Sequence, residues 1–318
     1  SNTNSLSELL NAQVGITSNN QGGVGQTSSY FIQGFEKKYI SILIDGVSFA
    51  DNTATQSETY LNSISLEEIE RIEILKGPQG AIYGSSAAGG VISIITKGNN
   101  KKGMNNSFSS RFGSFGTVSS NINTGYSADK WSVNLSINGT HSDGFSAKNT
   151  DEEEENDSFN SVKTALKFSL KNDNDLKFFS TFRQTDNKIQ YDNAFTTNDF
   201  NKIRQTAGSL KIEKKNNDLN SFIQISKQRT VRQFGIYQYY GDTFNFDFLN
   251  QYNLSYNHDF IFGFEYDDEK YDDKTTRADA DRNSFLTGFT GNINSNTGYD
   301  ISVRKENDTK YGSQNSSR

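Results

Sequence analysis

The 318-residue sequence contains no cysteine, one proline and one tryptophan. The absence of cysteine excludes a disulfide framework and any metal site built from thiolates. No run of about 18 apolar residues occurs, which excludes a spanning helix but leaves open a protein that crosses a membrane with strands. A basic stripe is also missing, because the net charge is −6 and the pI is near 5.1. We therefore expect no nucleic-acid partner.

Apolar residues are scarce, yet aromatic residues are plentiful. Hydrophobic residues make up 32% of the chain and aromatic residues 13%. A soluble globular domain is nearer about 45–50% apolar, and a disordered chain is poor in aromatic residues. A membrane β-barrel accounts for both numbers, because only alternate residues of each strand face lipid while the others line a polar interior.

Residues 1–98 are predicted to form a mixed α/β domain. Ser5–Ala12 has the pattern of a short helix capped by serine, and Leu66–Glu70 that of an acidic helical turn. Strands are expected at Tyr39–Ile44, Arg71–Leu75 and Val91–Thr96. The last of these is a continuous apolar run, which is typical of a strand buried on both faces.

From about residue 105 the pattern changes to period two, as in Val162–Leu170 and Phe260–Tyr266. Each such segment has one apolar and one mostly polar face, and we expect roughly ten or eleven strands of about ten residues. Short connections are expected at Lys171–Asn174 and Asn216–Asp218, and long polar ones near 142–158, 186–202, 231–243 and 267–283. Short turns at one end and long loops at the other are typical of outer-membrane barrels.

Four segments of the first domain carry a family resemblance. They are SLSELL at 5–10, GGVGQTSSYFIQG at 22–34, ILIDGV at 42–47 and RIEILKGPQGAIYGSSAAGGVISIITK at 71–97. In this order they resemble the plug domain of TonB-dependent receptors. A phosphate-binding loop is the alternative reading of the glycines, but the segment lacks the Gly-Lys-Ser/Thr that ends such a loop. The glycines are better explained by tight turns and close backbone packing.

The resemblance implies a plug at 1–98 followed by an antiparallel transmembrane β-barrel at 99–318. A barrel that holds a plug needs about 22 strands, and the 220 residues after position 98 (318 − 98) supply about half of them. We therefore expect the C-terminal half of the barrel, and the N-terminal part of the plug, to lie outside this chain.

The implied function is active import of a bulky nutrient across the outer membrane of a Gram-negative bacterium. The partners would be TonB, through a segment that precedes Ser1, the ligand, and outer-membrane lipid. No covalent chemistry is needed, and the sequence shows no nucleophile–base arrangement, so we expect neither an enzyme nor a required cofactor.

Within the family the likeness is closest to cobalamin transporters. A receptor for a ferric siderophore, haem or a glycan-derived ligand is the alternative. A secreted all-β adhesin or glycan-binding module is a remote third reading, and it leaves the 71–97 segment unexplained. Ligand contacts are expected at the plug apices, from Gln26, Ser28, Ser29, Asp51, Asn52 and Thr53.

Two further sets of charged residues are singled out by the resemblance. Charges at positions matching Arg71 and Glu73 pair across the plug–barrel boundary in the family, although here they could also be an ordinary solvated pair. In cobalamin transporters, loop aspartates bind calcium, and the matching positions are Asp151, Asp157, Asp192 and Asp199. Carboxylates on neighbouring loops suit such a hard cation, but a solvated charge run is the other interpretation of 151–155.

Overall fold

The fold was analysed in a computed structural model, which describes residues 5–20, 22–57, 59–98, 101–146, 156–192, 199–255, 257–294 and 296–317. The N-terminal domain holds short elements: α1 (Leu6–Asn11), β1 (Ile16–Asn20), β2 (Ser28–Ile32), β3 (Phe35–Glu36), η1 (Lys37–Tyr39), β4 (Ile40–Ile44), β5 (Val47–Ser48), η2 (Leu61–Ser63), η3 (Leu66–Glu68), β6 (Ile69–Lys76), α2 (Gly80–Tyr83), η4 (Ser85–Ala87) and β7 (Gly90–Thr96). No described helix has the length and apolar character needed to span a membrane.

The second part of the chain consists of twelve long strands. They are β8 (Gly103–Phe112), β9 (Val118–Ser127), β10 (Trp131–Ser142), β11 (Phe159–Lys171), β12 (Leu176–Tyr191), β13 (Asp199–Lys215), β14 (Leu219–Phe234), β15 (Tyr237–Ser255), β16 (His258–Asp272), β17 (Arg277–Asn294), β18 (Thr297–Asp308) and β19 (Gly312–Ser317). The predicted boundary at residue 98 falls between β7 and β8.

The predicted elements of the first domain are present, and local chemistry explains them. Ser5 caps α1, because its hydroxyl accepts a hydrogen bond from the Glu8 amide at 3.2 Å. Strand β4 ends at a turn in which Asp45 and Gly46 both have positive φ, +50° and +85°. Strand β7 is the predicted apolar run, and it lies between β4, to which it is parallel, and β6, to which it is antiparallel.

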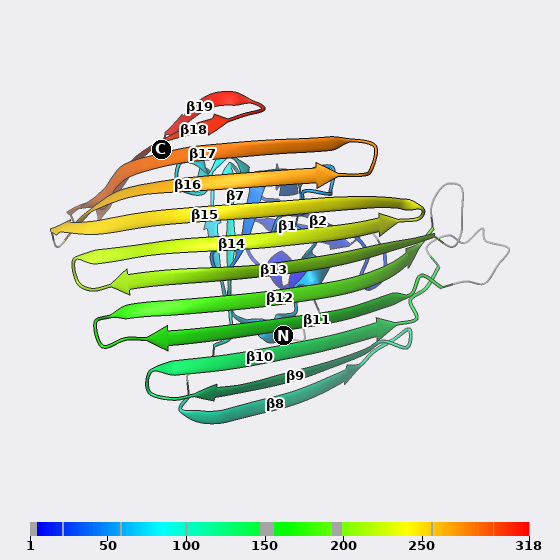
Figure 1. The fold of residues 1–318 in the computed structure, drawn as a ribbon. Coiled ribbons are helices and arrows are strands. Elements are labelled where there is room, and N and C mark those ends of the chain that lie inside the picture. Colours follow the sequence, from blue (N-terminus) through cyan, green and yellow to red (C-terminus); the bar gives the residue numbers. More distant parts are fainter. Residues whose placement is uncertain are drawn as a thin grey trace.

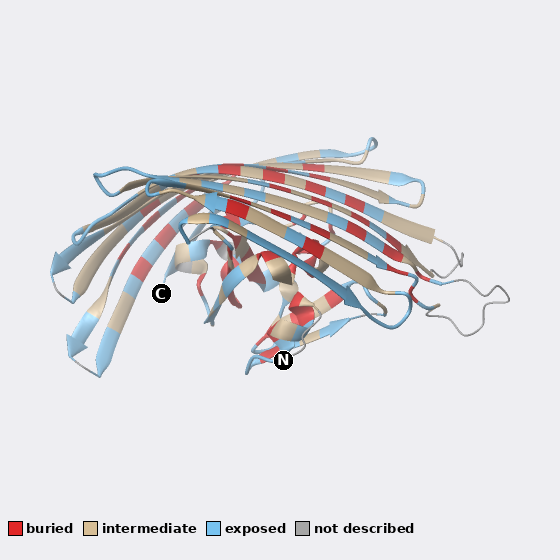
Figure 2. Cartoon of the chain, turned by 90° about the horizontal axis from the view of Figure 1, so that it is seen from below, coloured by how far each residue is buried: buried red, intermediate tan, exposed pale blue. Residues whose placement is uncertain are grey.

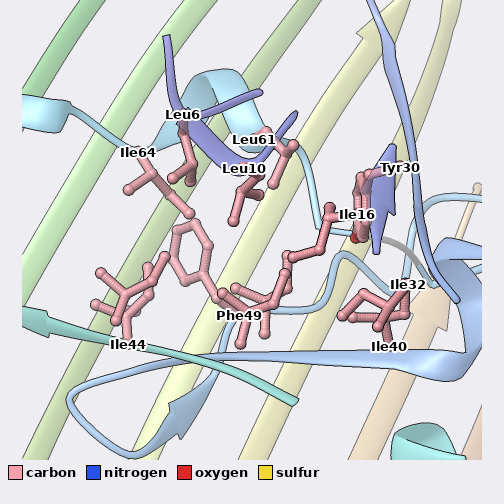
Figure 3. Packing of buried hydrophobic residues seen from close by; sticks show 14 residues of the cluster. Leu6, Leu10, Ile16, Tyr30, Ile32, Ile40, Ile44, Phe49, Leu61 and Ile64 are labelled. Atoms are coloured by element: carbon pink, nitrogen blue, oxygen red, sulfur yellow. The ribbon is translucent and has the colours of Figure 1, made fainter. Parts of the chain in front are cut away.

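The apolar core lies within the N-terminal domain. Figure 3 shows side chains from α1, β1, β2, β4 and η2 converging on one cluster. The buried members are Leu6, Leu10, Ile16, Tyr30, Ile32, Ile40, Ile42, Ile44, Phe49, Leu61, Ile64, Ile92, Ile94 and Ala207. Only Ala207 of these comes from the large sheet, so the first domain forms its core from its own residues.

The large sheet is a single antiparallel layer in which strands β8 to β19 pair in chain order. Figure 1 shows the long strands side by side, with the N-terminal domain behind them. In the view from below, the sheet arches over that domain (Figure 2). The domain therefore sits on the concave side of one curved layer. The twelve strands do not form a sandwich of two sheets.

The strands alternate between a face turned toward the N-terminal domain and a face turned away from it. On β12, Arg183 and Thr185 are buried and hydrogen bond to that domain, whereas Phe182 is 42% exposed. On β14, Gln224 is buried, and its neighbours Ile223 and Ile225 are exposed. The convex face thus carries the apolar side chains, which is the arrangement of a barrel wall in lipid.

The predictions of strand length and of two long connections are wrong. Strands β12 to β17 have 15 to 19 residues rather than about ten. The predicted long connections at 231–243 and 267–283 are instead strand, since β14 and β15 are joined by only 235–236 and β16 and β17 by 273–276. The polar residues there continue the ladder of backbone hydrogen bonds beyond the apolar belt.

The other two predicted long connections are present in shorter form. They join β10 to β11 (143–158) and β12 to β13 (192–198), and both lie at the same end of the sheet. The opposite end has only short turns, such as 128–130, 172–175 and 216–218. Long loops face the cell exterior in outer-membrane barrels, so the end with the long connections is the extracellular end.

Candidate functional site: the interface between the N-terminal domain and the sheet

A buried ion pair fixes the acidic turn η3 to β12. The two Nη atoms of Arg183 donate to the two carboxylate oxygens of Glu68 at 2.8 and 2.7 Å. Both side chains are nearly inaccessible, at 9% and 4% exposure. The Ser65 amide also donates to Glu68 at 2.8 Å, so a capping box orients the carboxylate before it meets the arginine. A two-point contact of this kind fixes both distance and direction.

A second pair joins the Asp45-Gly46 turn to β11. Lys167 donates to the Asp45 carboxylate at 2.8 Å and to the Thr96 carbonyl at 3.1 Å. The Thr96 amide donates to the same carboxylate at 3.1 Å. The turn that ends β4 and the end of β7 are therefore held together by the lysine of a sheet strand.

The third contact involves three residues that the sequence predicted as ligand-binding. Asp51 is fully buried and accepts a hydrogen bond from Arg232 of β14 at 2.5 Å. Thr53 donates to the same carboxylate through its amide, at 2.9 Å, and through its hydroxyl, at 2.6 Å. Asn52 donates to the backbone carbonyls of Asp242, at 3.3 Å, and of Lys270, at 3.1 Å. This loop therefore touches β14, β15 and β16 near their extracellular ends.

The charges in these ion pairs are always arranged in the same way. Glu67 adds a fourth pair with Arg111 of β8, at 2.6 Å. In all four, the N-terminal domain supplies the carboxylate and the sheet supplies the base. Neutral contacts are polar too: Gln224 and Gln228 donate to the carbonyls of Asp45 and Ala50. The domain is thus attached to the sheet mainly by hydrogen bonds and charge.

One apolar contact supplements them. Tyr60 packs with Phe159, Ile189 and Ile203 of the sheet, and its hydroxyl donates to the Gly25 carbonyl. Burial raises the pKa of Tyr60 above its ordinary value, so this phenol stays neutral and donates at physiological pH. Gly25 has φ +87°, and a Cβ there would lie 2.1 Å from the Phe159 ring. Glycine is therefore needed for both conformation and space.

The first glycine-rich loop reaches the sheet at the same end. Gln26 donates from its side chain to the Gln190 carbonyl of β12 at 2.8 Å. Ser28 is buried and donates to Asn20 at 2.7 Å, whereas Ser29 faces Asn19 in the register of β1 and β2. The structure thus brings Gln26 and Asn52 to the extracellular end and uses Ser28 within the domain. Ligand binding by any of them stays a prediction.

Arg71 and Glu73 lie next to each other on β6. Arg71 donates to Glu73 at 2.8 Å, and both side chains are more than half exposed. In the part of the chain that the structure describes, their ion pair is with each other and not with a strand of the sheet. A role in locking the domain to a barrel stays a prediction.

Three of the four predicted calcium ligands fall within the described residues, and Asp151 lies outside them. Asp199 pairs in register with Tyr191, the residue before Asp192, and Ser146 donates to Asp192 at 3.3 Å. Asp157 lies just before β11, at the same corner of the sheet. Among the described residues, no group of three or more His, Cys, Asp or Glu side chains is placed to hold a metal ion.

A cavity of about 600 Å³ lies between the N-terminal domain and strands β13 to β18. Its wall on the sheet side is rich in charge: Asp247, Glu265, Asp267, Glu269, Arg282 and Arg304. Arg304 donates to Glu265 at 2.6 Å, and Arg282 lies 3.7 Å from Asp267. This polar wall is typical of a water-filled barrel interior.

Sequence reasoning missed most of the residues that hold the two parts together. Glu68, Asp45, Lys167, Arg183 and Arg232 were not singled out. The one available signal was the alternation of the strands, which places Lys167 and Arg183 on polar faces. The choice of partner depends on tertiary packing, since Glu68 and Arg183 lie 115 positions apart.

Comparison with known proteins agrees with this geometry. The family model described as "TonB-dependent Receptor Plug Domain" matches residues 1–91. The vitamin B12 transporter BtuB of Vibrio cholerae serotype O1 is 29% identical over 293 residues, which cover 88% of this chain and 47% of the relative. BtuB of Vibrio vulnificus is 43% identical over 95 residues, covering 30% of this chain and 15% of the relative.

Solved structures show the same fold. The siderophore receptor PirA from Acinetobacter baumannii superposes with a TM-score of 0.79 at 16% identity, covering 99% of this chain and 55% of that one. A variant of the ferric enterobactin receptor from Pseudomonas aeruginosa gives 0.81 at 16% identity, with 99% and 56% coverage. The chain spans about half the length of the curated relatives it matches.

A plug enclosed by part of an antiparallel β-barrel defines an outer-membrane receptor of Gram-negative bacteria. Residues 1–91 match the plug domain of TonB-dependent receptors, and over 88% of its length the chain resembles their cobalamin transporters. The predicted fold class, a plug followed by an incomplete barrel, is confirmed. The total of about 22 strands stays a prediction. The relatives are transporters and receptors, which supports a role other than catalysis.

Proposed function

We propose that the receptor to which this chain belongs imports cobalamin across the outer membrane by a TonB-dependent mechanism. The observation that carries the proposal is the likeness to BtuB, which extends over 88% of the chain and includes both the plug and the sheet. The siderophore receptors are only 14–17% identical, so they support the fold and not the ligand.

The structure supports a plug that moves as a body. The plug has its own apolar core, and its contacts with the sheet are mostly hydrogen bonds and ion pairs. Water can replace such contacts at little net cost, because the separated groups become solvated again. Ligand bound at the extracellular end would act on the loop at residues 51–53, which already touches three strands. TonB would then act from the periplasmic side.

Binding and uptake test this function. The whole receptor is expected to bind cyanocobalamin in a calorimetric titration and to restore its uptake in cells that lack their own transporter. Asn52→Ala removes the contacts to β15 and β16, and it is expected to weaken binding about tenfold if this loop contacts ligand. Asn11→Ala is the matched control, because it removes the hydrogen bond from the Ser18 amide within the same domain and lies outside the predicted ligand contacts. Binding of a ferric siderophore in place of cyanocobalamin would favour the alternative receptor class.

We also propose a calcium site at the corner formed by the ends of β11, β12 and β13. Asp192 follows the last residue of β12, Asp199 is the first residue of the adjacent β13, and Asp157 precedes β11. Hard cations take six to eight oxygen ligands, so carboxylates from several loops would be drawn together. Removal of calcium with a chelator is expected to lower cyanocobalamin affinity in the native receptor and to leave an Asp192→Asn/Asp199→Asn variant unchanged. Equal affinity with and without calcium in the native receptor would contradict the proposal.

A further inference from the structure

Five basic side chains gather on the convex face of β12, β13 and β14. They are Lys188, Lys202, Arg204, Lys227 and Arg229, and all five are exposed. Their neighbours along the strands point the other way: Gln228, between Lys227 and Arg229, donates to the Ala50 carbonyl of the plug. The basic side chains therefore face outward, away from the plug. We call this group the β12–β14 basic patch.

The patch begins where the apolar belt ends. On β14 the outward residues run Ile223, Ile225, Lys227 and Arg229, and the two isoleucines are exposed. One step from Ile225 to Lys227 is about 7 Å of strand. The patch also lies toward the long connections, because β12 and β13 are joined at 192–198 just beyond Lys188 and Lys202. It is therefore level with the headgroups of the outer leaflet.

Acidic neighbours only partly neutralise the patch. Asp186 pairs with Arg204, and Asp242 lies opposite Arg229 in the register of β14 and β15. Five bases and these two acids leave a net charge of +3 (5 − 2). Among the described residues, the structure gives no acidic partner within ion-pair distance to the other members, and the whole chain is acidic. This local excess of positive charge is therefore a distinct feature of the convex surface.

One pair in the patch is unfavourable without a counter-ion. Lys188 and Lys202 are direct register partners across β12 and β13, on the same outward face. Like charges placed directly opposite each other destabilise a sheet. An anion between the two ammonium groups would reverse the sign of this contribution. Lys227 pairs in register with Gly208, which lies six residues along β13 from Lys202. The two lysines are therefore about 20 Å apart along the strands, so the patch can contact more than one anionic group.

We propose that the β12–β14 basic patch binds the phosphate groups of a phosphorylated glycolipid in the outer leaflet. Such a lipid places its acyl chains against the apolar belt and its phosphates at the level of Lys202 and Lys227. Basic side chains at this depth attract anionic headgroups electrostatically. Arg204 and Arg229 add planar, two-point contacts to phosphate oxygens. The proposal concerns the outer surface of the wall, and it is independent of which nutrient the receptor imports.

Native mass spectrometry of the whole receptor in detergent tests the proposal, with bisphosphorylated lipid A as the probe. Each lost base is expected to lower affinity about fivefold. The variants Lys188→Gln/Lys202→Gln and Lys227→Gln/Arg229→Gln should therefore each bind about 30-fold more weakly than the native receptor. The matched control is Lys214→Gln/Lys305→Gln, which removes two exposed outward charges elsewhere on the sheet and should bind like the native receptor.

The same lipid with its phosphates removed provides the second arm. The native receptor should bind the phosphate-free lipid about as weakly as the two patch variants bind the phosphorylated lipid. Native affinity in both patch variants would overturn the proposal, as would equal binding of the phosphate-free lipid or an equal loss in the control. All substituted side chains are exposed, and two independent double variants keep the test decisive if one of them fails to assemble.

Discussion

The ion pair between Glu68 and Arg183 allows the sharpest prediction on plug docking. Glu68→Gln keeps the size of the side chain and one oxygen that can accept from the Ser65 amide. It removes the charge that neutralises Arg183, whose side chain is 9% exposed. Breaking a buried pair by removing one partner costs about 3–5 kcal/mol, because the remaining charge stays buried without compensation.

A loss of about 3 kcal/mol corresponds to roughly a 100-fold increase in the population of undocked plug. Hydrogen exchange of the plug amides in the whole receptor measures this population directly. The increase should be largest around η3 and β6, which Glu68 anchors to β12.

An exposed pair between two turns of the sheet supplies the control. Lys130→Gln removes an ion pair with Asp173 whose side chains are both more than half exposed, and solvent-screened pairs contribute about 0–1 kcal/mol. Exchange of the plug amides in this variant should stay close to that of the native receptor. The reasoning fails if Glu68→Gln behaves like Lys130→Gln, or if Arg183→Met combined with Glu68→Gln is as strongly destabilised as Glu68→Gln alone.

Three other consequences can be measured in the same receptor. Gly25→Ala should destabilise the plug by about 1–3 kcal/mol in denaturant titrations, since its Cβ would overlap the Phe159 ring and φ is +87°. Ile92→Ala, at a fully buried position of β7, should cost about 2–5 kcal/mol by the same assay. Hydrogen bonds from Thr275 and from neighbouring amides lower the pKa of Asp273, in the turn after β16, to about 2. The ionised Asp273 carboxylate should therefore stabilise the turn fully above about pH 4, and this stabilisation should be lost as the pH falls from 4 to 2. Hydrogen exchange of the turn amides should show this loss in the native receptor and not in Asp273→Asn.

Local sequence signals were sufficient where the structure depends on near neighbours. A serine cap and a continuous apolar run located α1 and β7. Alternating apolar residues located the long strands and also determined which face of each would be outward. These patterns reflect backbone geometry and burial within a few residues, so no tertiary information is needed to read them.

The same reasoning failed where strands leave the apolar belt. Residues 231–243 and 267–283 lack the strict alternation of apolar and polar residues, and segments without that alternation were interpreted as loops. The backbone of β14 to β17 nevertheless continues to pair there, because each strand has a neighbour that satisfies its amides and carbonyls. Ladder hydrogen bonds depend on register with that neighbour, and the sequence pattern of one strand does not contain it.

Partner choice across the plug–sheet interface was equally hidden. An acidic turn at Leu66–Glu70 was recognised, but not that Glu68 is buried while Glu70 is exposed. Asp51 was singled out as a ligand contact, whereas the structure pairs it with Arg232. A carboxylate that is a structural anchor and one that contacts a ligand look alike in sequence, because both need only a short polar loop.

Apolar contacts lie mostly within the plug, whereas the contacts between plug and sheet are mostly polar, and this difference supports the proposed function. If the plug were attached to the sheet by a shared apolar core, its movement would expose that core to water at about 25 cal/mol per Å². Instead, thirteen of the fourteen buried cluster residues belong to the plug, and the sheet contributes only Ala207. Apart from the Tyr60 contact with Phe159, Ile189 and Ile203, the contacts that must break are mainly ion pairs and hydrogen bonds, whose groups are solvated when they separate. A plug built in this way can leave its position without unfolding, which is what the proposed import through the barrel requires.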